Sequence, residues 1–231
     1  MLDSIRIGKF TSSKISDLLT VNRKGDGFGA PALRLIQRAK YEHKLGRSLE
    51  SDVSSKPCNW GKLLEKRVQS MLPFEMNYQS IETLIHPTQT SWAGTPDYVG
   101  NGTVGDIKCP WTLLSYVELY EALEGGVEDF KEVSSEYYWQ LVSNAILTNS
   151  KFAEITIYCP YQDELEDIRN LARNQEQDQQ RYAFINFALD DDLPYLIRGN
   201  YYQNFKQLKF EVSEEDKSKL TQAVRQASLL I

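Results

Sequence analysis

Two aspartates and a lysine near the middle of the chain have the types and spacing needed for metal-assisted hydrolysis. Asp106 and Lys108 lie two residues apart in a strand-like run, so their side chains project from the same face of a strand. Asp97 ends the preceding run, and the Gly100-Asn101-Gly102 turn between the runs favours a tight hairpin. We therefore expect a pair of carboxylates with an ammonium group at its edge.

This arrangement suits a magnesium ion, which prefers oxygen ligands and is typically held by one or two carboxylates together with waters and substrate phosphate. The lysine can then orient or deprotonate the attacking water while the metal stabilises charge at the phosphate. The spacing alone also allows a structural ion pair between Asp106 and Lys108, with Asp97 as a turn residue after Pro96. Two charges on the inward side of a strand are costly without a partner, which favours the functional interpretation.

The surrounding segments predict a mixed sheet flanked by helices, of the α/β or α+β class. Strand-like runs at 79–86, 91–99 and 103–108 are expected to form an antiparallel meander. Further elements are expected as helices at 112–124 and 134–149, a strand at 152–159, then a helix, an irregular segment, a strand near 205–212 and a final helix.

A helix predicted at 60–72 brings a third carboxylate to this region. Glu65 lies within its apolar face, beside the expected core. The apolar residues of that face are Leu63, Leu64, Val68, Met71 and Leu72.

The N-terminal third is basic although the whole chain has a net charge of -6. Residues 1–70 hold 14 Lys and Arg against 7 Asp and Glu, a net charge of +7, and residues 71–231 carry the remaining -13. This asymmetry is typical of a nucleic-acid surface and also of a solvated helix face.

Three segments make up most of this basic region: a short helix at 11–20, a glycine-rich connector at 23–31 and a basic helix at 31–46. Pro31 suits the first turn of the basic helix, and Arg34 and Arg38 share one of its faces.

Length and composition indicate one domain, because 231 residues with 41% hydrophobic content can build a sizeable core. The three cysteines, Cys58, Cys109 and Cys159, form no C-x-x-C pair and are expected to be reduced, packed thiols. No segment has the length and apolarity of a membrane span, so we expect a cytoplasmic protein.

Several blocks, in this order, resemble the phage lambda exonuclease and YqaJ-like viral recombinase family of PD-(D/E)XK nucleases. The blocks are Arg6-x-Gly8-x-x-Thr11-x-Ser13, Trp60-Gly61-Lys62-x-x-Glu65, Gly94-x-Pro96-Asp97, Asp106-x-Lys108-Cys109-Pro110, and Tyr137-x-x-Gln140 followed by Leu147-Thr148. Together they span residues 6–150, and their joint occurrence is more specific than any one block. The resemblance implies a restriction-endonuclease-like core at about 57–160, a DNA-contacting part at 1–70 and a C-terminal appendage at 161–231.

The resemblance also assigns roles to the central residues. It implies that Asp97, Asp106 and the backbone carbonyl of Ile107 bind Mg²⁺, with Glu65 near a second ion directly or through water, and that Mn²⁺ can substitute. Lys108 then prepares the nucleophile and Gln140 helps to hold it. Two positions depart from the family pattern: Asp106 stands where the family usually has Glu, and Val142 where some relatives carry a second glutamine.

A 5′-phosphate pocket is implied at Arg6, Thr11 and Ser13, where a guanidinium and hydroxyls would lie near the start of the 11–20 helix. Without the resemblance, the simpler interpretation is that Ser13 caps the helix and that Arg6 is a surface charge. Further DNA contacts are expected from Arg34, Arg38, Tyr137 and Trp111.

These features predict a magnesium-dependent 5′-to-3′ double-stranded DNA exonuclease that leaves 3′ single-stranded tails for phage-type recombination. A restriction-type or repair endonuclease on the same scaffold remains an alternative, as does a catalytically silent DNA-binding scaffold. The resemblance further implies double-stranded DNA ends as substrate, a homotrimeric ring, a single-strand annealing partner and no membrane association.

Overall fold

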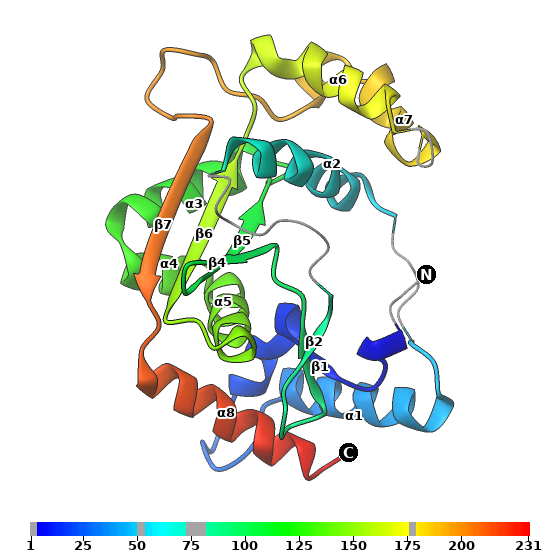
Figure 1. The fold of residues 1–231 in the computed structure, drawn as a ribbon, viewed down its shortest axis with the longest axis vertical. Helices are drawn as coiled ribbons and strands as arrows, with labels where there is room; N and C mark the ends of the chain where they lie inside the picture. Colours follow the sequence, from blue (N-terminus) through cyan, green and yellow to red (C-terminus); the bar gives the residue numbers. More distant parts are fainter. Residues whose placement is uncertain (1–3, 50–53, 73–81, 176–178) are drawn as a thin grey trace.

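The described strands form two sheets in this computed structural model, which covers residues 4–49, 54–72, 82–175 and 179–231 (Figure 1). The larger sheet has the order β4-β5-β6-β7, with strands Tyr98–Gly100, Thr103–Lys108, Phe152–Tyr158 and Phe205–Glu211. β5 and β6 run parallel, whereas the two outer pairs are antiparallel. The prediction of a mixed sheet flanked by helices is therefore confirmed.

Strand β5 lies inside this sheet and is buried along nearly its whole length. Val104 packs in the apolar core on one side of the sheet, and Ile107 packs in a second core on the other side. Because successive side chains of a strand point to opposite faces, Asp106 and Lys108 lie on the same face as Val104. The strand therefore carries two charged groups inward, and the side chains of Asp106 and Lys108 are only 1% and 21% exposed.

The smaller sheet has the order β1-β3-β2, with strands Phe10–Thr11, Trp92–Gly94 and Leu84–Ile85. The prediction of one continuous strand at 91–99 was wrong, because β3 pairs with β1 and β2 while β4 pairs with β5. Pro96 lies in the break between them, and proline has no N–H to donate to a sheet. The expected meander is thus split between two sheets.

The 79–86 run is only partly described. Residues 79–81 lie outside the described residues, and within the described part only Leu84–Ile85 forms a strand.

The helices cover both faces of the larger sheet (Figure 1). The α-helices of the described ranges are α1 Ala30–Leu45, α2 Lys56–Met71, α3 Leu113–Gly125, α4 Val127–Val133, α5 Ser135–Thr148, α6 Leu165–Arg173, α7 Gln179–Phe187 and α8 Glu214–Ser228. Short 3-10 helices are η1 Ser4–Arg6, η2 Ser12–Leu19, η3 Gln162–Glu164 and η4 Asp190–Asp192.

The short helix predicted at 11–20 is present as the 3-10 helix η2. Two other helix predictions need correction. Helix α2 begins at Lys56, four residues before the predicted start, because the Ser55 side chain caps it by accepting a hydrogen bond from the Cys58 backbone N–H at 3.4 Å. Helix α4 was not predicted; after Gly126, whose φ of 99° ends α3, the chain at once starts a new helix with acidic residues in its first turn.

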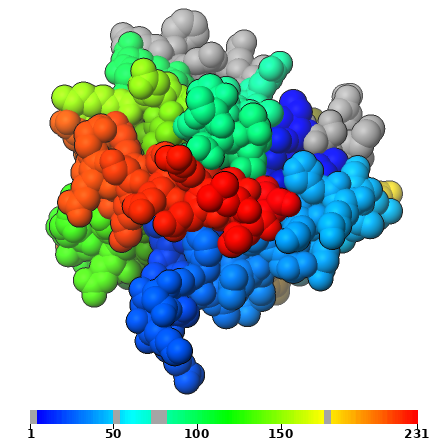
Figure 2. All heavy atoms as spheres, turned by 90° about the horizontal axis from the view of Figure 1, so that it is seen from below, coloured from blue at the N-terminus to red at the C-terminus, as the bar shows by residue number. Residues whose placement is uncertain are grey.

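Two apolar cores stabilise the fold. The first core joins η2, α1, α5 and α8 to the larger sheet. Figure 2 shows α8, the C-terminal helix, lying beside α1 on one face of the molecule. The second joins α2 to α6 and α7 on the other side. In α2, Leu63, Leu64 and Val68 are buried as predicted, but Met71 is 43% exposed and does not belong to the apolar face.

The prediction that the cysteines are reduced, packed thiols is confirmed only in part. All three are free thiols, and Cys159 is buried, but Cys58 is exposed and Cys109 is half-buried. Within the residues described, no helix is both long enough and apolar enough to span a membrane.

Candidate active site

A closed set of polar contacts joins Asp106, Lys108 and Gln140. Lys108 Nζ lies 2.7 Å from Asp106 Oδ2, and the Gln140 side-chain N–H donates to Asp106 Oδ1 at 2.6 Å. Lys108 Nζ also donates to Gln140 Oε1 at 3.3 Å. Strand β5 and helix α5 thus hold the three side chains in one geometry, with the Asp106 side chain only 1% exposed.

Asp97 reaches the same place from the loop between β3 and β4. Its Oδ2 accepts a hydrogen bond from the Ile107 backbone N–H at 2.6 Å, and its own backbone N–H donates to the Gly105 carbonyl at 3.1 Å. The β4–β5 hairpin closes through Asn101 and Gly102, which both have positive φ angles. The hairpin turn was predicted, and it brings Asp97 beside β5.

Glu65 approaches from α2 and shares a cleft of about 520 Å³ with these residues. Its pKa is raised, first by burial and then by the nearby charge of Asp106, although Lys108 partly offsets this. The cleft therefore collects Glu65, Asp97, Asp106, Lys108 and Gln140, all five of the residues for which the sequence predicted a catalytic role.

Negative charge is in excess at this cleft. Burial, together with the charges of Asp106 and Glu65, raises the pKa of Asp97 well above its usual range. Burial opposes the charged form of Lys108, but the attraction of Asp106 and Asp97 outweighs it and raises the pKa of that amine. One lysine thus faces three carboxyl groups whose crowding a further cation would relieve.

The residues fit a hard divalent cation. Asp106 Oδ2 is buried, and its close partner among the described residues is the Lys108 ammonium, with which it forms an ion pair at 2.7 Å. In the ranges that the structure describes, no three His, Cys, Asp or Glu side chains are grouped to ligate one ion. A metal here would therefore be held by one or two carboxylates, a backbone carbonyl and water, which is a donor set that Mg²⁺ accepts.

Two aromatic residues line the cleft. The Tyr137 ring lies 4.7 Å from Lys108 Nζ, a cation–π distance that helps to hold the amine. Trp111 packs edge-on against Trp60 at 5.5 Å and Phe184 at 5.7 Å, so its indole also belongs to the wall between α2 and α7. The contact of Tyr137 and Trp111 with DNA stays a prediction.

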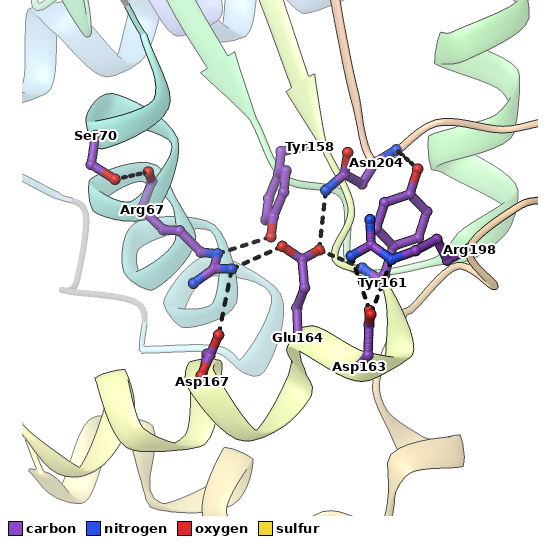
Figure 3. A network of polar contacts seen from close by, with 9 residues as sticks. All are labelled: Arg67, Ser70, Tyr158, Tyr161, Asp163, Glu164, Asp167, Arg198 and Asn204. Atoms are coloured by element: carbon purple, nitrogen blue, oxygen red, sulfur yellow. Dashed lines mark hydrogen bonds and ion pairs between the residues drawn. The ribbon is translucent and has the colours of Figure 1, made fainter.

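A half-buried network of polar contacts anchors α2, the helix that carries Glu65 (Figure 3). Arg67 donates to Glu164 Oε1 at 2.8 Å and to the Tyr158 hydroxyl at 3.0 Å. Glu164 Oε2 accepts from the Tyr161 backbone N–H and the Asn204 side chain. These contacts fix α2 against the end of β6, so they hold Glu65 at a set distance from the sheet.

The N-terminal residues meet in a separate small cavity of about 80 Å³. Arg6, Thr11, Ser13 and Arg38 line it, and the Arg6 Nε atom is buried with no hydrogen-bond partner among the described residues. Thr11 Oγ1 and Ser13 Oγ lie 3.4 Å apart. Arg34 is exposed and does not line this cavity, so its predicted DNA contact is not part of the same pocket.

Sequence reasoning missed Glu42, which organises this cavity. Its carboxylate is 3% exposed and accepts from the Gly8 and Leu49 backbone N–H groups at 3.0 and 2.9 Å and from Arg38 at 3.2 Å. Although burial opposes the charged form, these hydrogen bonds lower the Glu42 pKa. The only signal in the sequence was an acid four residues after Arg38 on a basic helix.

Buried hydroxyl groups join η2, which follows Thr11, to α5, which carries Gln140. Ser12, between Thr11 and Ser13, has its Oγ 2.8 Å from Ser143 Oγ, one helical turn beyond Gln140 on α5. The Trp92 indole N–H also donates to Ser143 at 2.8 Å. Val142, where some relatives carry glutamine, is fully buried in the first core.

A mixed sheet flanked by helices, with clustered carboxylates and a lysine at the end of an inner strand, is the restriction-endonuclease-like fold. Residues 3–180 match the family model of the YqaJ-like viral recombinase domain, and the chain belongs to that family. The resemblance seen in the sequence is thereby confirmed.

Solved structures of exonucleases share this fold. The alkaline exonuclease LHK-Exo from Laribacter hongkongensis superposes with a TM-score of 0.59 at 14% identity, covering 97% of this chain and 90% of its own. LHK-Exo in complex with dAMP gives 0.61 at 15% identity, covering 97% and 88%. A phage-related exonuclease from Haemophilus somnus 129PT gives 0.60 at 14% identity, covering 96% and 92%. Comparison with curated proteins gives no match.

Proposed function

We propose that this protein is a divalent-metal-dependent exonuclease that degrades double-stranded DNA from a 5′ end and leaves 3′ single-stranded tails for recombination. The observation that carries the proposal is the Asp106–Lys108–Gln140 contact set with Asp97 beside it in one cleft. Membership of the YqaJ-like family and the fold shared with exonucleases support it.

The metal site would consist of Asp97, Asp106 and the Ile107 carbonyl, with Glu65 binding a second ion directly or through water. Bound Mg²⁺, or Mn²⁺ in its place, supplies Lewis-acid stabilisation of the phosphate oxygens. Gln140 holds the Asp106 carboxylate and the Lys108 amine in register. Lys108, held between Asp106 and Gln140, is placed to orient or deprotonate the attacking water and to stabilise developing charge.

The N-terminal cavity favours an exonuclease over an endonuclease. The Arg6 Nε atom is buried, has no hydrogen-bond partner within the described ranges and lies in a cavity with two hydroxyl groups, which suits a terminal phosphate. The link from Ser12 to Ser143 would hold that phosphate at a fixed distance from the cleft. The homotrimer, the single-strand annealing partner and the cytoplasmic location are further proposals, supported by the family resemblance.

Linear and covalently closed duplex DNA distinguish the candidate functions. With Mg²⁺, we expect the protein to digest linear duplex and leave closed circles intact, because the pocket requires a strand end. Gel analysis of both substrates with and without EDTA checks this. Nicking or linearisation of the circles would instead support the endonuclease, and inertness toward both substrates would support the silent scaffold.

The strand end provides a second prediction. Duplex DNA with a 5′-phosphate should be degraded at least about tenfold faster than 5′-hydroxyl DNA, because a charge-assisted contact to Arg6 contributes roughly 1.5–3 kcal/mol. Arg6→Ala should remove this preference and keep the basal rate on 5′-hydroxyl DNA. Initial rates on the two substrates measure it, with Arg34→Ala, outside the cavity, as the matched control. Equal wild-type rates on both substrates would contradict the pocket.

A further inference from the structure

Gly61 lies in the interior of α2, on the face that lines the active-site cleft. Glycine inside a helix lowers its stability relative to alanine, because glycine loses more backbone freedom on folding. Gly61 therefore costs α2 about 1 kcal/mol relative to alanine, so its surroundings show whether packing or function offsets that cost.

Packing within the described chain does not require this glycine. A methyl group built on Gly61 would meet no described heavy atom within 4 Å, and its φ is not in the positive region. Gly94 and Gly105 are different, because a Cβ at Gly94 would collide with the Ser12 side chain and a Cβ at Gly105 would collide with the Tyr98 ring. The space in front of Gly61 belongs to the cleft.

Gly61 sits in the middle of a stripe that leads out of the catalytic centre. Cys58, Gly61 and Glu65 follow each other at spacings of three and four residues, so they share one face of α2, and all three line the cleft. Glu65 lies beside Asp106 at the inner end, and Cys58 is exposed. At 1.5 Å rise per residue, Gly61 is about 6 Å along the axis from Glu65.

We propose that Gly61 is a substrate-contact residue, whose bare helix backbone receives the sugar–phosphate backbone of the DNA strand being cut. The inference rests on the proposed nuclease function. A phosphate held at Asp106 and Lys108 brings its attached nucleotide against the cleft wall, and the nearest turn of α2 outward from Glu65 is the one at Gly61. Because Gly61 has no Cβ, the DNA strand can approach the helix more closely there than it could at any other type of residue.

The proposal predicts opposite signs for stability and activity in Gly61→Ala. The melting temperature should rise by about 2 °C, because alanine favours the helix and finds free space. The kcat/KM on 5′-phosphorylated linear duplex should fall about 10- to 100-fold, because the methyl group displaces the strand from its productive position. Gly61→Met should lose more activity than Gly61→Ala, since it fills more of the cleft.

Ser70→Thr is the matched control, since it adds one methyl group to an exposed position of α2 outside the cleft. Its activity should equal that of wild type, and the Mg²⁺ concentration for half-maximal rate should be the same in all these variants. If Gly61→Ala has the kcat/KM of wild type, or a lowered melting temperature, the inference about Gly61 is overturned and the proposed function still stands. A wild-type protein without metal-dependent hydrolysis would instead overturn the proposed function beneath it.

Discussion

Asp106→Asn is expected to abolish metal-dependent DNA hydrolysis while the protein stays folded. Asparagine keeps the size of the side chain and can still accept the hydrogen bond from Gln140 at Oδ1. It removes the buried negative charge that would bind the cation, so the rate should fall by about 10³-fold or more. Initial rates on linear duplex over a range of Mg²⁺ concentrations measure the loss.

Asp163→Asn is the control for this substitution. Asp163 forms an exposed ion pair with Arg198 away from the cleft, so its neutralisation should leave hydrolysis unchanged. Mg²⁺ should raise the melting temperature of wild type and of Asp163→Asn, but not of Asp106→Asn, because binding to the folded state alone stabilises it. Substantial Mg²⁺-dependent activity in Asp106→Asn would exclude the aspartate as a metal ligand.

The pH dependence of stability offers a readout that needs no DNA. In metal-free protein the pKa values of Asp97 and Glu65 are raised, by burial and by Asp106, so the folded state binds their protons more tightly than the unfolded state does. Stability should therefore fall as the pH rises from about 4 through the raised pKa values. Asp106→Asn should flatten this fall, because it removes the charge of Asp106, which is one cause of both raised pKa values.

Much of the site could be predicted because its chemistry follows local rules. The two-residue repeat of a strand puts Asp106 and Lys108 on one face, and the glycine turn brings Asp97 back toward them. The hydrogen bond from the Ile107 backbone N–H to Asp97 was not predicted, because it depends on where the loop after β3 crosses the strand.

The errors concern long-range pairing. Trp92–Gly94 leaves the larger sheet because Phe10–Thr11, about 80 residues earlier, pairs with it, and no local spacing reveals that partner. Glu42 was missed for a related reason. Its role depends on the Gly8 backbone, 34 residues away, and a lone acid on a basic helix is equally consistent with a solvated ion pair.

Lys108→Ala is expected to slow hydrolysis by about 10²- to 10⁴-fold at saturating Mg²⁺ without weakening metal binding. The amine contacts Asp106, Gln140 and the Tyr137 ring, so it is placed at the reacting centre without being a metal ligand. Removing a preorganised charge at such a point typically costs about 3–4 kcal/mol of transition-state stabilisation. Single-turnover rates and Mg²⁺ titrations separate the chemical step from binding.

The stability of the same variant distinguishes a catalytic cation from a structural counterion. Without metal, Lys108→Ala leaves the Asp106 carboxylate buried and unpaired, which should destabilise the fold by about 3 kcal/mol. Mg²⁺ should restore most of this loss, because it supplies the missing positive charge, and should therefore stabilise the variant more than wild type. If Lys108 were only a counterion, restoring the fold with Mg²⁺ would restore the rate as well. A variant that is refolded by Mg²⁺ and still slow is the expected outcome, whereas near-normal turnover would assign Lys108 to stability alone.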